Sequence, residues 1–139
     1  MSMLNETMLV CDVMLKLDRA PVVQKDTLLK RGLEVMSQTN LGIVCIVGDE
    51  NKLLGILTDG DIRRKLLKVQ KPFSAFFVDD AIHHAIRTPF TIKSNDTLAK
   101  AVQIMGEKRI WDLPVIDGSE KLVGLLHLHP AVQALLDTQ

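Results

Sequence analysis

The hydrophobic pattern of the chain is organised around one junction between an apolar run and an amphipathic segment. The run Leu53–Leu57 breaks at Thr58-Asp59-Gly60-Asp61 and is followed by the amphipathic segment Ile62–Leu67, which predicts a strand, a tight turn and a helix. A hydroxyl and two carboxylates thus stand where the helix begins. Free backbone N–H groups and the helix dipole favour an anionic ligand at such a position. We therefore expect the main binding site at this turn.

The same pattern occurs twice along the chain. The run LLGIL at 53–57 aligns with LVGLL at 122–126, which places Gly55 and Gly124 in register, and Asp26-Thr27-Leu28 recurs as Asp96-Thr97-Leu98. Each copy reads as helix, strand, turn, strand, helix. We expect a first repeat at 1–70, a linker at 71–78 and a second repeat at 79–139. One copy alone has too little core, so the two should pack around a pseudo-two-fold axis with clefts between them.

Several boundaries of these elements can be predicted from local residue types. A short polar side chain should cap the helix before each hairpin, namely Asp26 or Thr27 in the first copy and Asn95 or Asp96 in the second. These helices should end near Met36 and Met105, and Asn40 marks the end of the first. Shorter helices are expected at 8–15, within 69–85 and at 131–137. The predicted fold class is α/β (α+β), with a small sheet and flanking helices in each repeat.

Composition narrows the functional classes. The 139 residues are 47% hydrophobic, and Lys+Arg and Asp+Glu both number 17, which indicates a globular protein and gives no support to a nucleic-acid or anionic-membrane partner. The two cysteines, Cys11 and Cys45, have no C-x-x-C spacing, so we expect reduced thiols rather than a disulfide or a zinc site. The chain also lacks a membrane-spanning run and a signal-peptide pattern. A cytoplasmic protein without a cofactor is expected.

The motif GILTDGD at Gly55–Asp61, together with the internal repeat, resembles a tandem pair of CBS domains. More narrowly, LGIVCIVGDENKLLGILTDGDIRR and LVGLLHLH resemble the C-terminal half of bacterial arabinose 5-phosphate isomerases, in which a sugar-isomerase domain precedes the CBS pair. The TDGDIRR signature also resembles CBS pairs attached to sugar-nucleotide transferases. The resemblance implies a regulatory module that binds an adenosine or cytidine nucleotide or a CMP-sugar. It also implies a homodimer and a catalytic domain in the parent protein.

The resemblance assigns roles to the turn at the centre of the chain. Thr58 would hydrogen-bond a phosphate or ribose oxygen, while Asp61 would accept from the ribose hydroxyls. A structural role is open beside this one, in which Thr58 caps the helix and Asp61 interacts with its dipole. The expected ligand-binding set also includes Asp59, Gly60, Val22 and Val23.

The second copy departs from this motif. Aligning Gly55 with Gly124 places His127 opposite Thr58 and Pro130 opposite Asp61, so we expect one nucleoside site in each chain. His127 and His129 should face the same side of a strand, where they could contact an anionic sugar, ligate a metal or simply cap the cleft. Two histidines fall short of a full ligand set, and we therefore predict no metal site.

The remaining candidates lie beside these two motifs. Arg63 and Arg64 could pair with a phosphate, although at least one of them should face solvent. By resemblance, Arg109, Trp111 and Asp112 lie near a neighbouring ligand, and Trp111 could stack on a base or be buried in the core or a dimer interface. His83 and His84 are expected on a solvated helix face.

Three functional classes follow from these observations. The leading one is a regulatory ligand-binding module that acts through a partner domain. The second is a structural dimerisation module without a physiological ligand. The third is an enzyme, which we disfavour because the sequence shows no nucleophile–base pair, glycine-rich phosphate loop or metal cluster.

Overall fold

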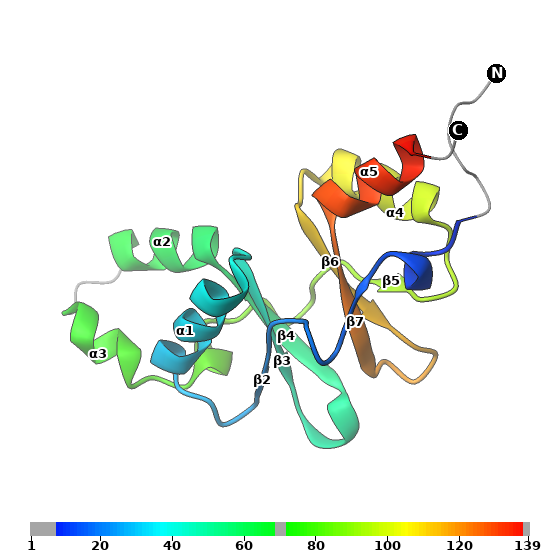
Figure 1. Cartoon of the computed structure of the whole chain (residues 1–139). Helices are drawn as coiled ribbons and strands as arrows, with labels where there is room; N and C mark the ends of the chain where they lie inside the picture. Colours follow the sequence, from blue (N-terminus) through cyan, green and yellow to red (C-terminus); the bar gives the residue numbers. More distant parts are fainter. Residues whose placement is uncertain (1–7, 69–71, 138–139) are drawn as a thin grey trace. The chain divides into compact units, whose positions relative to one another are not determined.

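The computed structural model describes residues 8–68 and 72–137, which form two compact units (Figure 1). One unit is Pro21–Pro89, and the other combines the described residues of Met1–Ala20 and of Phe90–Gln139. These bounds differ from the repeats expected at 1–70 and 79–139, because the segment that leads into each repeat packs with the sheet of the other repeat. Residues 69–71, which include the expected end of the first repeat and the start of the linker, lie outside the described part.

The unit Pro21–Pro89 is built on a three-stranded sheet of order β2-β3-β4. Strand β2 runs parallel to β3, whereas β3 and β4 form the antiparallel hairpin that the sequence predicts. The strands are β2 (Val22–Gln24), β3 (Ile43–Val47) and β4 (Leu53–Thr58). The helices are α1 (Leu29–Thr39), α2 (Asp59–Lys68) and α3 (Phe73–Phe77), with short 3-10 turns η2 (Asp49–Asn51) and η3 (Ala81–His84).

The core of this unit lies between one face of the sheet and its helices. Because successive strand residues point to opposite faces, the strand pairing places Val23, Val44 and Leu57 together on the helix-covered face. They pack there with buried residues of the helices and turns, including Leu29, Val35, Met36, Ile62, Phe76 and Ala81. Val22 and Thr58 belong to the opposite face.

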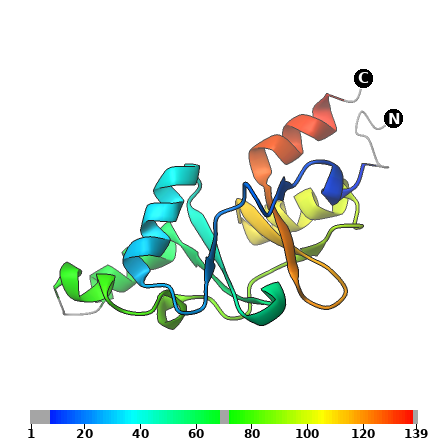
Figure 2. The same ribbon diagram turned by 60° about the horizontal axis from the view of Figure 1, so that its bottom comes forward.

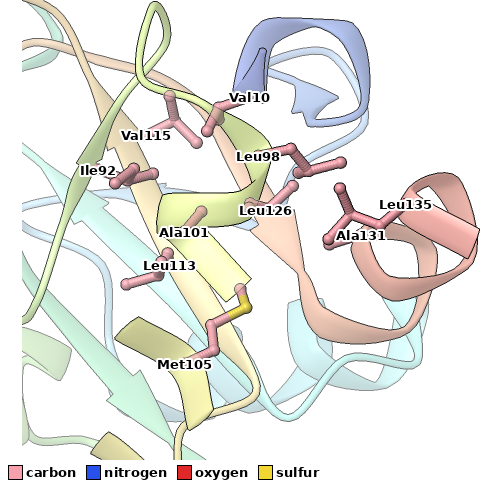
Figure 3. Packing of buried hydrophobic residues seen from close by; sticks show 10 residues of the cluster. All are labelled: Val10, Ile92, Leu98, Ala101, Met105, Leu113, Val115, Leu126, Ala131 and Leu135. Atoms are coloured by element: carbon pink, nitrogen blue, oxygen red, sulfur yellow. The ribbon is translucent and has the colours of Figure 1, made fainter. Parts of the chain in front are cut away.

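The second unit repeats this plan around a four-stranded sheet of order β1-β7-β6-β5. Helices α4 and α5 lie side by side against it (Figures 1 and 2). Val10 from the N-terminal segment lies in the same core as Leu98, Leu113 and Leu126 (Figure 3). The elements are η1 (Val10–Asp12), β1 (Leu15–Lys16), β5 (Ile92–Lys93), α4 (Leu98–Lys108), β6 (Asp112–Ile116), β7 (Leu122–His127) and α5 (Leu128–Leu136).

Each of the two aligned glycines lies where the segment that precedes one repeat contacts the sheet of the other repeat. Gly55 pairs with Ile46 and Gly124 with Val115, which confirms their common register. A Cβ on Gly55 would lie 2.7 Å from the carbonyl oxygen of Ile86, and one on Gly124 would lie 2.5 Å from that of Leu15. No real Cβ tolerates such a separation, so the backbone approach requires glycine at both positions.

The predicted helix caps are wrong by one or two residues. The N-cap of α1 is Leu28, without a side-chain cap, and the N-cap of α4 is Thr97, whose hydroxyl accepts from the Lys100 N–H at 3.2 Å. The helices begin at Leu29 and Leu98, which share the register of the two glycines. The two DTL tripeptides are offset from that register by one residue, so the N-cap position holds Thr97 in one unit and Leu28 in the other.

Other element ends differ modestly from expectation. The predicted helix at 8–15 is instead the 3-10 turn η1 followed by β1, and the last helix begins at Leu128 rather than at Ala131. Asn40 ends α1 as predicted, in the left-handed conformation with φ 55°, and Arg109 ends α4 in the same way. Across residues 8–68 and 72–137, no helix has the length and apolar character needed to cross a membrane.

Candidate ligand-binding site

The candidate site of the unit Pro21–Pro89 lies at the junction between β4 and α2. Thr58 ends the strand, and its hydroxyl accepts a hydrogen bond from the Asp61 backbone N–H at 3.1 Å. The same hydroxyl donates to the Asp61 carboxylate, with Thr58 Oγ1 2.6 Å from Asp61 Oδ2. Thr58 therefore caps α2 by satisfying one of the free N–H groups of its first turn, as the structural role predicted.

Arg64 completes this cluster from one turn further along α2. Its Nη2 atom lies 2.6 Å from Asp61 Oδ1, so Thr58 and Arg64 each engage a different oxygen of the carboxylate. The guanidinium folds over Gly60, where an added Cβ would lie 3.3 Å from Arg64 Nη1. The Asp61 side chain is 22% exposed and that of Arg64 56% exposed. Arg63 is also exposed, which agrees with the expectation that at least one of the two arginines faces solvent.

The electrostatic surroundings keep Asp61 ionised. Partial burial acts to raise its pKa, but hydrogen bonds from Thr58 and Arg64 and the positive charges of Arg64 and Lys65 together lower the pKa below the ordinary value of 3.8. At neutral pH the side chain therefore accepts hydrogen bonds and donates none.

Asp59 and Gly42 shape the start of α2 in a different way. The Asp59 N–H donates to the Gly42 carbonyl oxygen at 3.0 Å. A Cβ on Gly42 would come within 2.8 Å of Asp59 Oδ2, so the absence of a side chain at position 42 makes room for this carboxylate. Asp59 is exposed at the turn, beside the Thr58–Asp61–Arg64 cluster.

The two valines predicted for the site have different positions. Val22 pairs with Cys45 on β3, and Cys45 pairs in turn with Ile56, so Val22 shares the sheet face of Thr58. Val23 instead lies in the core between the sheet and the helices. Alternation along β2 thus turns the Val23 side chain away from the face of Thr58, and a ligand contact of Val23 stays a prediction.

The corresponding junction in the second unit carries a different polar pair. His127 Nδ1 lies 2.8 Å from Asp112 Oδ1, and the two residues are directly paired across β6 and β7. The Asp112 side chain is only 9% exposed. It stands where the first unit has the buried Ile43, which pairs with Thr58. A carboxylate at this position needs a partner, and His127 supplies one.

The alignment of the two junctions agrees with their backbone hydrogen bonds. The Leu128 N–H donates to the Trp111 carbonyl oxygen at 2.8 Å, as the Asp59 N–H does to that of Gly42. His127 therefore replaces Thr58, and Pro130 replaces Asp61, as the sequence predicts. The Asp112–His127 pair was missed, because the alignment relates the two repeats to each other but does not give the pairing of β6 with β7.

The other predicted residues of the second unit do not all gather at this junction. His129 lies in the first turn of α5 and is exposed, so the expectation that it faces the same side of a strand as His127 is wrong. Trp111 is 68% exposed, which excludes the core as its place. Arg109 is exposed at the end of α4. Among the residues that the structure describes, no three His, Cys, Asp or Glu side chains are grouped to hold a metal ion.

One histidine outside both junctions was also misassigned. His84 is mostly buried in η3, its Nε2 atom lies 2.8 Å from Asp79 Oδ2, and its ring packs on Phe76. It does not belong to a solvated helix face as expected. The sequence offered no signal for this, because the partner is held by a turn rather than by helical spacing.

Comparisons with known proteins place the repeats in a family. The model of the CBS domain matches residues 10–68 and 78–129. The crystal structure of CBSX2 in complex with AMP superposes with a TM-score of 0.79 at 24% identity, over 91% of this chain and 95% of that one.

Curated bacterial proteins match at higher identity. An uncharacterised protein of Helicobacter pylori strain J99 is 32% identical over 121 residues, which are 86% of this chain and 35% of that protein. The arabinose 5-phosphate isomerase KdsD of Yersinia pestis is 30% identical over 125 residues, 90% of this chain and 37% of the isomerase. The chain thus spans little more than a third of the length of these relatives. Its two matched repeats establish that it belongs to the CBS domain family, as a pair of CBS domains.

Proposed function

We propose that this CBS pair is a regulatory module that binds a phosphorylated nucleoside at the Thr58–Asp61 junction. The observation that carries the proposal is the ionised Asp61 carboxylate, held by Thr58 at the start of α2. A carboxylate that only accepts hydrogen bonds suits the paired hydroxyls of a ribose. The positive end of the α2 dipole suits a phosphate. The CBSX2 structure, which contains AMP, supports the ligand class.

The proposed ligands are adenosine and cytidine nucleotides and CMP-sugars. The parent that we propose is an arabinose 5-phosphate isomerase, in which a catalytic sugar-isomerase domain precedes the CBS pair. The KdsD relative supports this parent, since the matched region is little more than a third of that isomerase. In such a protein, a CMP-activated sugar acid formed further along the same route would be a fitting effector. Its binding would act through the partner domain by changing the free-energy balance between two states.

Calorimetric titration of the chain with AMP, ATP, CMP and a CMP-sugar tests the proposal. At least one of these ligands should bind, and Asp61→Ala should weaken its binding by about 1 to 3 kcal/mol, the scale of hydrogen bonds to a charged group. Asp49→Ala is the matched control, because it removes an exposed carboxylate of the same unit, away from the junction between β4 and α2.

Two results would count against a nucleotide sensor. Equal binding by wild type and Asp61→Ala would remove Asp61 from the site. Failure of all four ligands to bind the wild-type chain would favour the structural dimerisation module instead.

A further inference from the structure

We propose that Arg64 makes this site selective for ligands that carry a phosphate over the corresponding neutral nucleosides. The inference rests on the proposed function and adds to it a residue that determines specificity. It starts from an observation about the chain without ligand: the carboxylate assigned to the ribose already has a positively charged partner on its own helix.

Both oxygens of Asp61 are engaged in short hydrogen bonds. Oδ2 accepts from the Thr58 hydroxyl at 2.6 Å and Oδ1 accepts from Arg64 at 2.6 Å. The Thr58 hydroxyl is also tied to the Asp61 N–H, so this side of the carboxylate is fixed by the cap itself. Arg64 is held from one side only, because its side chain is 56% exposed and reaches Asp61 from the next turn. Each carboxylate oxygen can accept more than one hydrogen bond, but a ribose hydroxyl that takes the position of Arg64 Nη2 on Oδ1 displaces the guanidinium.

The charge balance of this competition depends on the ligand. A neutral nucleoside that displaces Arg64 exchanges a charge-assisted hydrogen bond for a weaker one and leaves the guanidinium without its anion. A nucleotide brings a phosphate that takes over the role of Asp61, and a guanidinium can bind a phosphate through two parallel hydrogen bonds. The guanidinium already lies over Gly60, with Nη1 3.3 Å from the place of an added Cβ. It therefore stands at the start of α2, where the helix dipole also favours a phosphate.

Arg64 is distinguished from the other basic residues of α2 by its contact. The positive charge of Lys65 also lowers the pKa of Asp61, but a hydrogen bond from Lys65 is not among the causes of that shift. Lys68 is exposed in the last turn of the helix, at the end remote from Thr58. Removing the charge of Lys68 therefore changes the net charge of α2 by the same amount as removing that of Arg64, while leaving the contact with Asp61 in place.

The test compares the affinities of AMP and adenosine, and of CMP and cytidine, by calorimetry on the full chain. Arg64→Gln should lower the ratio of nucleotide to nucleoside affinity by about tenfold, the scale of one charge-assisted hydrogen bond. Nucleotide binding should weaken, and nucleoside binding should be unchanged or tighter. Lys68→Gln should leave the ratio within about twofold of wild type. Arg64→Lys keeps the charge but loses the planar pair of donors, so it should retain only part of the selectivity.

The outcomes separate this inference from the proposed function. If the nucleotides bind and Asp61→Ala weakens them, but Arg64→Gln leaves the ratio unchanged, the function stands and the role of Arg64 is refuted. An equal loss of nucleotide selectivity in Lys68→Gln would also refute it, because a diffuse charge effect would then suffice. If the wild-type chain binds none of AMP, ATP, CMP and the CMP-sugar, both proposals fail. Circular dichroism of each variant checks that the fold is intact. We expect an intact fold in the Arg64 variants because the Arg64 side chain is exposed.

Discussion

Replacing Gly124 with alanine tests the way in which the N-terminal segment is built into the second unit. A Cβ at this position would lie 2.5 Å from the Leu15 carbonyl oxygen and 2.8 Å from Met14 Sδ. The methionine side chain can move aside, but the carbonyl belongs to β1, which is paired with β7 at Leu15–Leu125 and Lys16–Gly124. The backbone of β1 must therefore recede from β7 by at least the difference between 2.5 Å and 3.0 Å, the shortest separation that real Cβ atoms show.

The cost of this movement can be estimated from the contacts at risk. Overpacking a well-filled site costs about 1 to 3 kcal/mol, and the obstacle here is backbone rather than a flexible side chain. The movement also weakens ladder hydrogen bonds, worth about 1 kcal/mol each, and disturbs the segment that carries the fully buried Val10. We expect Gly124→Ala to lower the free energy of unfolding by about 2 to 3 kcal/mol.

Gly106→Ala is the matched control in the same unit. Nothing lies within 4 Å of a Cβ placed on Gly106, which is inside α4, so this substitution should stabilise the protein by about 0.5 to 1 kcal/mol. Urea unfolding followed by far-UV circular dichroism measures both changes. Hydrogen exchange should also become faster at the amides of Val10 and Cys11, which bond to Asp96 and Ser94. A Gly124→Ala midpoint equal to or above that of wild type would refute the reasoning.

The remaining predictions concern Asp61 and the helix caps. Since the folded state lowers the pKa of Asp61, its ionised form stabilises the protein above the ordinary value of 3.8. The difference in unfolding free energy between wild type and Asp61→Asn, measured by urea titration, should be constant near neutrality. It should shrink as the pH falls through the pKa that Asp61 has in the folded state. An increase of this difference on acidification would contradict the expectation. Thr97→Ala should cost about 1 kcal/mol, whereas Leu28→Thr should stabilise α1 by up to about 1 kcal/mol. Destabilisation by Leu28→Thr in the same assay would argue against the register of the two helices.

The part of the candidate site between β4 and α2 could be predicted from local spacing. Thr58 and Asp61 are three residues apart across a strand-to-helix junction, which is the spacing that lets a hydroxyl cap a helix and meet a carboxylate of its first turn. The contact from Arg64 to Asp61 is equally local, at a spacing of three residues. This contact was not predicted, because Arg64 was expected only to pair with a phosphate.

Contacts between distant residues were beyond this kind of prediction. Asp112 and His127 meet only because β6 and β7 pair in one particular register, and His84 meets Asp79 through an irregular turn. The burial of Val23 also depends on which face of the sheet the helices cover.

The sequence by itself determined the elements of this protein and their repetition. Residue types and their spacing indicate two hairpins, two glycines in register and the polar turn after Leu57. Each of these features depends on neighbours along the chain. Only the tertiary structure decided that residues 8–20 build the sheet and core of the second unit rather than of the repeat that follows them. The physical reason is that an apolar segment can bury itself equally well against either of two similar sheets. Strand pairing and core packing over the whole chain decide between the two sheets. A local sequence pattern does not contain this information.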